Sequence, residues 1–181
     1  MILQELFDEQ LAAGYETDKG TAHSYIPFYE EVLKPYYEAQ PINLLEIGIG
    51  NGQSLMLWRS YFSHRASHIF GIDKNQADER VHGDWFEIIE DATNPKAYEW
   101  LPAMDIIIDD GSHYVEEIIK TFLLAKHLLK SNGIYIIEDI QDDTVIKEIE
   151  SVAYFQIVDR RKYGQYDDRL GVWKTWHEKK Q

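Results

Sequence analysis

Short apolar runs alternate with longer amphipathic segments through most of this 181-residue chain, and this alternation restricts the fold more than any other feature. The runs are rich in isoleucine and aromatic residues and end at glycine or acidic residues, which is typical of buried strands. They span residues 43–47, 68–72, 85–89, 105–108 and 135–137. Such alternation predicts an α/β fold, in which helices cover both faces of a mostly parallel sheet.

The clearest helix and a closing hairpin are both expected in the second half of the chain. Apolar residues recur at three- and four-residue spacing over residues 115–129, and Asn132-Gly133 supplies the signal that predicts the end of this helix. Residues 154–158 and 170–176 are strand-like, and the polar segment 159–169 joins them. Two strands joined in this way predict an antiparallel hairpin at the edge of the sheet.

The first forty residues are expected to be helical and to cover the ligand-binding edge of the sheet as a lid-like segment. They are rich in aromatic residues, and glycine and proline interrupt them at Gly14, Gly20, Pro27 and Pro35. No linker or internal repeat divides the chain. Residues 1–181 are therefore expected to form a single Rossmann-like domain with a seven-stranded sheet.

The composition argues against several classes of function. Eighteen basic and thirty-two acidic residues give a formal net charge of −14, which disfavours binding to nucleic acids and to anionic membranes. The chain has no cysteines, so disulfides, thiolate catalysis and cysteine-bound zinc are excluded. The start of the chain is acidic and unlike a signal peptide, and no apolar run is long enough to span a bilayer. We expect a soluble cytoplasmic protein, and leave open whether it forms a homo-oligomer.

A glycine-rich loop follows the first apolar run. Its glycines, Gly48, Gly50 and Gly52, allow a sharp turn and a close approach of the backbone to a ligand. Position 53 is Gln, so the pattern typical of dinucleotide-binding oxidoreductases is incomplete. Adenosylmethionine has no phosphate, and its methionyl ammonium needs a nearby carboxylate such as that of Glu46. The loop therefore favours S-adenosylmethionine as the cofactor.

Acidic residues also end the second and third apolar runs. Asp73 is expected to bind the ribose hydroxyls, and Asp91 with Ala92 is expected to meet the adenine. The alternative is an ordinary strand-to-helix turn whose acidic residues are solvated helix caps. Three acidic residues at three successive strand ends favour the adenosyl cofactor.

A second acidic group follows the fourth and fifth runs. If these strands are neighbours, Asp110, Glu138 and Asp139 meet at the edge where open α/β sheets bind ligands. Clustered carboxylates need a cation, and oxygen ligands favour Mg²⁺ or another hard divalent cation. His113 is then the candidate general base for a metal-bound substrate hydroxyl. Alternatively, Asp109 and Asp110 cap the following helix and His113 is a loop residue.

Together these motifs resemble the class I S-adenosylmethionine-dependent methyltransferases over roughly residues 42–176. Position 113 is histidine, where catechol-type enzymes have lysine. In this feature the chain is most similar to the metal-dependent sugar O-methyltransferases of macrolide and related antibiotic tailoring. Further matches to that family are residues 17–20 (Thr-Asp-Lys-Gly), His23, Tyr25, residues 45–48, residues 54–55 and Trp58. The resemblance implies that Lys19 and Tyr25 contact the methionyl end of the cofactor or the substrate.

We therefore predict an enzyme that transfers a methyl group from S-adenosylmethionine to a hydroxyl of a small molecule, with metal assistance. The acceptor is expected to be a sugar, a nucleotide-sugar or a glycosylated secondary metabolite. The alternatives are a metal-independent N- or O-methyltransferase, a nucleotide-binding oxidoreductase and a non-catalytic module. One basic cluster, residues 160–162 with Arg169, is either a diphosphate site or a solvated hairpin loop.

Overall fold

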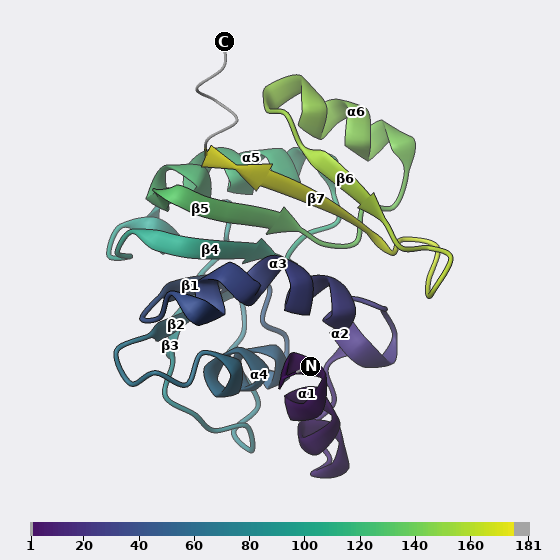
Figure 1. Cartoon of the computed structure of the whole chain (residues 1–181). Helices are drawn as coiled ribbons and strands as arrows, with labels where there is room; N and C mark the ends of the chain where they lie inside the picture. Colours follow the sequence, from purple (N-terminus) through teal and green to yellow (C-terminus); the bar gives the residue numbers. More distant parts are fainter. Residues whose placement is uncertain (1, 176–181) are drawn as a thin grey trace.

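A seven-stranded sheet in the order β3-β2-β1-β4-β5-β7-β6 forms the centre of the protein (Figure 1). The structure is a computed structural model, and it describes residues 2–175. The strands are β1 (Asn43–Ile47), β2 (His68–Asp73), β3 (Phe86–Ile89), β4 (Met104–Asp109), β5 (Leu129–Ile137), β6 (Gln156–Asp159) and β7 (Arg169–Lys174). Strands β1 to β5 are parallel, and β7 is antiparallel to both β5 and β6. The predicted sheet with its closing hairpin is confirmed.

Helices cover both faces of the sheet, as predicted (Figure 1). They are α1 (Ile2–Ala12), α2 (Asp18–Thr21), α3 (Ile26–Glu38), α4 (Gln53–Tyr61), α5 (Val115–Ala125) and α6 (Asp143–Val152), with 3₁₀ turns at η1 (Pro95–Tyr98) and η2 (Lys126–Leu128). Successive strand residues point to opposite faces. Leu44 and Ile106 pack with α1, α3 and α4, whereas Leu45 and Ile107 pack with α5 and α6. Burial on both faces explains why the strands are almost continuously apolar.

The parallel register brings the carboxyl ends of the central strands to one edge of the sheet. Ile47 lies opposite Ile72 on one side and Asp109 on the other, and Asp109 lies opposite Ile137. Backbone hydrogen bonds of 2.8–2.9 Å continue this pairing into the residues that follow, from Gly48 to β2, from residue 110 to β1 and from residue 138 to β4. The loops after β1, β4 and β5 therefore lie side by side.

The N-terminal helices do not join the sheet, as expected, but three of the four predicted interruptions lie inside helices, and one of them is Gly20 in α2. Gly14, with φ 87°, does separate α1 from α2. Pro27 instead lies in the first turn of α3, where its missing N–H would have no helical partner. Pro35 lies inside the same helix, which continues around it because its apolar side, including the fully buried Leu33, packs in the core.

The predicted helix over residues 115–129 is too long. It ends at Ala125, and β5 begins at Leu129, so Asn132 and Gly133 lie inside a strand. The reason is the pairing of β5 with β4, because the register shifts between Met104 and the next pair and β5 takes up the additional residues there. Helix α6 was not anticipated, and residue 176, at the end of the predicted hairpin, lies outside the described residues.

No helix within residues 2–175 combines the length and apolar character that crossing a membrane requires.

Candidate functional site

A cavity of about 900 Å³ opens at the carboxyl ends of β1, β2 and β4. The predicted site residues that line it are Gly48, Gly50, Asp73, Asp91, Ala92, Asp110, His113 and Asp139. The others, Lys19, Tyr25, Glu46, Gly52 and Glu138, do not line it and are placed by other contacts. The cavity lies where parallel α/β sheets bind their ligands.

The glycine loop is held open by Asp73. Gly48, Gly50 and Gly52 have φ values of 81°, 51° and 89°, a region that side-chain-bearing residues rarely adopt. The backbone N–H groups of Ile49 and Gly50 both donate to Asp73 Oδ2, at 3.1 Å each. Asp73 therefore fixes the loop as well as facing the cavity, a role that the sequence pattern did not reveal.

The loops after β1 and β4 touch at Gly48. A Cβ atom at this position would lie 2.1 Å from the carbonyl oxygen of Asp110 and 2.6 Å from the Cα of Gly111. Glycine at position 48 therefore sets the distance between the predicted cofactor loop and the predicted metal ligands.

Asp91, which follows β3, also lines the cavity. It accepts hydrogen bonds from the backbone N–H of Thr93 at 2.8 Å and from the Thr93 hydroxyl at 2.9 Å. Lys74 lies 3.1 Å from it. The pKa of Asp91 is lowered, first by the hydrogen bonds from Thr93 and then by Lys74. The neighbouring Ala92 also lines the cavity, as predicted for a contact with adenine.

Glu46, the predicted partner of the cofactor ammonium, does not line the cavity. Its side chain is fully buried behind the glycine loop, where the Ser54 hydroxyl donates to it at 2.7 Å. Lys19 Nζ lies 3.2 Å from its other oxygen. The cation beside Glu46 is therefore a side chain of the protein itself.

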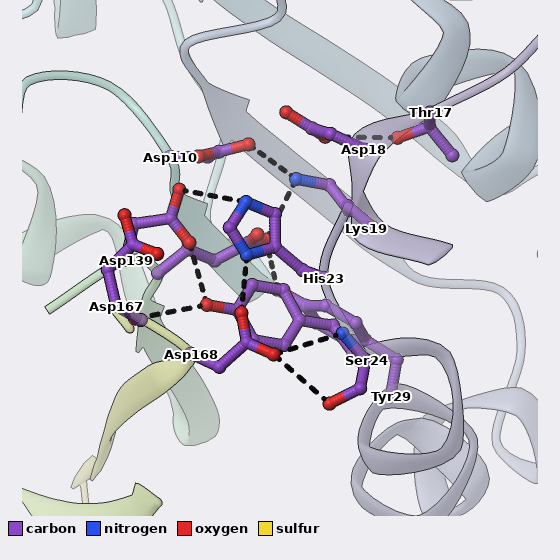
Figure 2. A network of polar contacts seen from close by, with 12 residues as sticks. Thr17, Asp18, Lys19, His23, Ser24, Tyr29, Asp110, Asp139, Asp167 and Asp168 are labelled. Carbon is purple, nitrogen blue, oxygen red and sulfur yellow. Dashed lines mark hydrogen bonds and ion pairs between the residues drawn. The ribbon is translucent and has the colours of Figure 1, made fainter. Parts of the chain in front are cut away.

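Lys19 joins the ends of three neighbouring strands. Its Nζ lies 2.6 Å from Asp110, 2.9 Å from Glu138 and 3.2 Å from Glu46, and its side chain is 1% exposed. Figure 2 shows the side chain reaching from α2 to Asp110. Burial lowers the pKa of Lys19, but the attraction of the three carboxylates outweighs it and the pKa is raised well above its ordinary value. The ammonium stays charged.

The cluster nevertheless holds more negative than positive charge. Three carboxylates contact one ammonium, and Asp139 adds a fourth charge near Asp110 and Glu138. When all four are ionised, they and Lys19 leave an excess of three negative charges. Burial raises the pKa of Asp110 to about 7, although Lys19 opposes the shift. Burial and then Asp110 raise the pKa of Glu138 well above its ordinary value. Such a set of oxygen donors fits a hard divalent cation, which supplies the charge that Lys19 alone does not.

Asp139 is held from the side of the N-terminal segment. Its φ of 54° lies in the left-handed region, which is uncommon outside glycine. The Tyr25 hydroxyl donates to it at 2.6 Å. His23 Nε2 lies 3.6 Å from Asp139 Oδ2 (Figure 2). The His23 ring is oriented by the buried Asp168, 2.6 Å from Nδ1. The pairing of His23 with Asp168 was not predicted, because 145 residues separate the two in the chain.

His113 lies at the mouth of the cavity. It is exposed and lines the cavity together with Asp110. The alternative in which Asp109 and Asp110 cap α5 is wrong, because Tyr114 occupies the N-cap position and no side chain caps the helix. Asp109 instead accepts a hydrogen bond of 2.7 Å from the Tyr135 hydroxyl.

The predicted basic cluster is dispersed. Arg169 is buried and donates to the Ile140 carbonyl at 2.9 Å, and Arg160 donates to the Ser24 carbonyl at 2.7 Å. Arg161 pairs with an aspartate two residues earlier. Lys162 and Arg160 both lie over the Tyr163 ring, 4.5 and 5.1 Å from its centroid. The four residues of the predicted cluster are therefore divided among three different sets of contacts.

Comparison with known proteins identifies the family. Residues 45–140 match a family described as a methyltransferase domain, and this range includes the glycine loop and all three predicted metal ligands. The chain belongs to this methyltransferase family.

Relatives with assigned activities methylate sugar hydroxyls. The 8-demethyl-8-alpha-L-rhamnosyl tetracenomycin-C 2'-O-methyltransferase of Streptomyces olivaceus is 28% identical, over 89% of this chain and 47% of its own length. A related 3'-O-methyltransferase of the same organism, acting on the 2-methoxy-rhamnosyl compound, is 34% identical over 72% of this chain and 36% of its own length. The chain thus spans less than half the length of these relatives.

Among solved structures, the fold is similar to that of the MycE methyltransferase from the mycinamycin biosynthetic pathway, in complex with Mg, SAH and mycinamycin VI. The TM-score is 0.64 and the identity 28%, over 76% of this chain and 38% of that one.

Proposed function

We propose that the protein is an S-adenosylmethionine-dependent O-methyltransferase that acts, with a divalent cation, on a sugar hydroxyl of a glycosylated small molecule. The observation that carries the proposal is the arrangement of three groups around one cavity: the glycine loop, the carboxylates after β4 and β5, and His113. The relatives named as sugar O-methyltransferases, and the MycE structure with Mg and SAH, support the same assignment.

The cofactor would lie along the glycine loop. Asp73 and Asp91 face the cavity from the ends of β2 and β3, where they would accept hydrogen bonds from the ribose hydroxyls and the adenine amine. Gly48 and Gly50 let the backbone approach the ligand closely. The methionyl end would then point toward Asp110 and the acceptor.

Asp110, Glu138 and Asp139 would hold the divalent cation, which when bound lowers the pKa of a nearby substrate hydroxyl. His113, which lines the same cavity, would accept the hydroxyl proton while the hydroxyl oxygen bonds to the methyl carbon. The bond between that carbon and the sulfonium sulfur breaks, and its electron pair stays on sulfur, which gives S-adenosylhomocysteine. The protein's main contribution is to align oxygen, carbon and sulfur.

The charge of the cavity favours a neutral acceptor over a nucleotide-sugar. Within the described part of the chain, the cavity lining has eight acidic side chains and one lysine, Lys74, which pairs with Asp91. A diphosphate would meet repulsion from these carboxylates and would find no arginine among the lining residues described.

Methyl transfer to a rhamnosylated aromatic acceptor, with and without chelator, tests the proposal. We expect His113→Ala to lower kcat by about 10²- to 10⁴-fold, the usual contribution of a general base, with unchanged affinity for S-adenosylhomocysteine. His127→Ala is the matched control, because His127 is exposed in η2 at the opposite end of β5. Full activity in chelator would support the metal-independent alternative, and unchanged turnover in His113→Ala would exclude the role as base.

A further inference from the structure

The carboxylate cluster has an inner and an outer side. Asp110 and Asp139 line the cavity, and their side chains are 15% and 11% exposed. Glu46 and Glu138 do not line it and are almost completely buried. The Lys19 ammonium lies on the inner side, in contact with both buried acids and with Asp110.

The inner side has the shape of a metal site. One carboxylate oxygen each from Glu46, Asp110 and Glu138 lies within 4.8 Å of the other two. Oxygens bound to one divalent cation are separated by at most about 4 to 5 Å, twice the metal–oxygen distance. Oε1 of Glu46 is buried and accepts no hydrogen bond within the described part of the chain, although Lys19 lies 3.2 Å away. An oxygen placed in this way is available to a cation.

The other contacts of the buried acids keep this geometry without Lys19. The Ser54 hydroxyl holds the second oxygen of Glu46 at 2.7 Å, and the Tyr29 hydroxyl donates to Glu138. Glu46 lies within β1, opposite Ile108, and Glu138 directly follows β5 and donates its backbone N–H to the Asp109 carbonyl, so the sheet fixes both backbone positions. The oxygens of Glu46 and Glu138 are therefore held from outside the cluster, and Asp110 is held through its backbone N–H, which donates to the Ile47 carbonyl at 2.9 Å.

We propose that the Lys19 ammonium occupies an inner cation position formed by Glu46, Asp110 and Glu138, and thereby confines the divalent metal to the outer side of the cluster, facing the cavity. Lys19 is then a positioning residue, which limits the cluster to one metal ion. This inference rests on the proposed metal site, but it makes a separate statement about ion number and location.

The test counts bound Mn²⁺ by titration followed by electron paramagnetic resonance. Wild type is expected to bind one ion and Lys19→Met two, because methionine keeps most of the side-chain length and removes the charge. Lys19→Met/Glu46→Gln is the matched control: it loses an inner ligand, keeps Asp110, Glu138 and Asp139, and is expected to bind one. A Lys19→Met protein that still binds one ion with wild-type affinity would overturn the inference. Failure of the proposed outer site gives a different result, no ion in wild type and one in Lys19→Met.

A second measurement needs no variant, in case Lys19→Met does not fold. Amine acetylation followed by mass spectrometry reports whether Lys19 leaves the cluster when metal binds. The proposal expects Lys19 to stay at least tenfold less reactive than the exposed Lys34, both without metal and with saturating Mg²⁺. Labelling of Lys19 that rises to the level of Lys34 on addition of Mg²⁺ would show that the metal displaces the ammonium, and would refute the proposal.

Discussion

Replacing Gly48 by alanine tests whether the cofactor loop and the metal ligands form one packed unit. The new Cβ would lie 2.1 Å from the Asp110 carbonyl oxygen and 2.5 Å from its carbonyl carbon. Ordinary contacts between heavy atoms are about 3.5–4.0 Å, so the two loops must separate by more than about 1 Å. Overpacking of this kind costs about 1–3 kcal/mol. The φ of 81° adds about 1–2 kcal/mol of backbone strain, giving a loss of about 2–5 kcal/mol in the free energy of unfolding.

Gly50→Ala separates strain from collision. Gly50 also has a positive φ, 51°, but a Cβ there would meet no atom within 4 Å. We expect this variant to lose only the strain, about 1–2 kcal/mol, in urea denaturation. Titration calorimetry should show that Gly48→Ala weakens both S-adenosylhomocysteine and Mg²⁺ binding, because the displaced segment carries Asp110. Equal destabilisation by the two substitutions would refute the reasoning.

Two further predictions concern the acids after β4 and β5. Burial raises the pKa of Asp109 from its ordinary 3.8 to about 6, although Tyr135 donates a hydrogen bond to it. The folded pKa exceeds the unfolded one, so the stabilisation is complete below about pH 4 and is lost as the pH rises to about 6. At 1.36 kcal/mol per pKa unit, the difference of about two units corresponds to about 3 kcal/mol. The free energy of unfolding of Asp109→Asn, measured by urea denaturation at each pH, should therefore rise by about this amount relative to wild type between pH 4 and 7. Parallel pH dependences of the two proteins would contradict this. Tyr25→Phe removes the 2.6 Å hydrogen bond to Asp139 and should weaken Mg²⁺ binding by about 10- to 100-fold in calorimetry. Tyr36→Phe is the control, because it loses only a hydrogen bond to the Asn132 carbonyl and should leave Mg²⁺ binding unchanged.

Residues that directly follow the parallel strands could be placed from the sequence. Asp73, Asp91, Asp110 and Asp139 were predicted from the ends of apolar runs, and all four line the cavity. The reason is that a parallel sheet brings the carboxyl end of every strand to one edge. The position of a residue just after its own strand is therefore enough to place it at that edge. His113 follows by the same argument, three residues after Asp110.

Side-chain contacts between distant segments could not be predicted in this way. Glu46 precedes the glycines and therefore looked like a cofactor ligand. It shares a face of β1 with Leu44, because alternate strand residues point the same way, and that face lies under α3 and α4 rather than at the strand end. Only the position of α2, which depends on tertiary packing, reveals that Lys19 is the partner of Glu46.

The strong negative charge of the chain is concentrated where the proposed reaction needs it. The net charge of −14 disfavours nucleic acids and anionic membranes as partners but says nothing about where the charge lies. The structure places eight acidic side chains around the cavity, and two more, Glu46 and Glu138, directly behind it. A sulfonium cofactor and a divalent cation both bring positive charge, so an acidic cavity binds them together with less mutual repulsion. Lys19 balances part of this charge from the core side through Glu46, Glu138 and Asp110, and leaves Asp139 and the other acids of the lining to the ligands in the cavity.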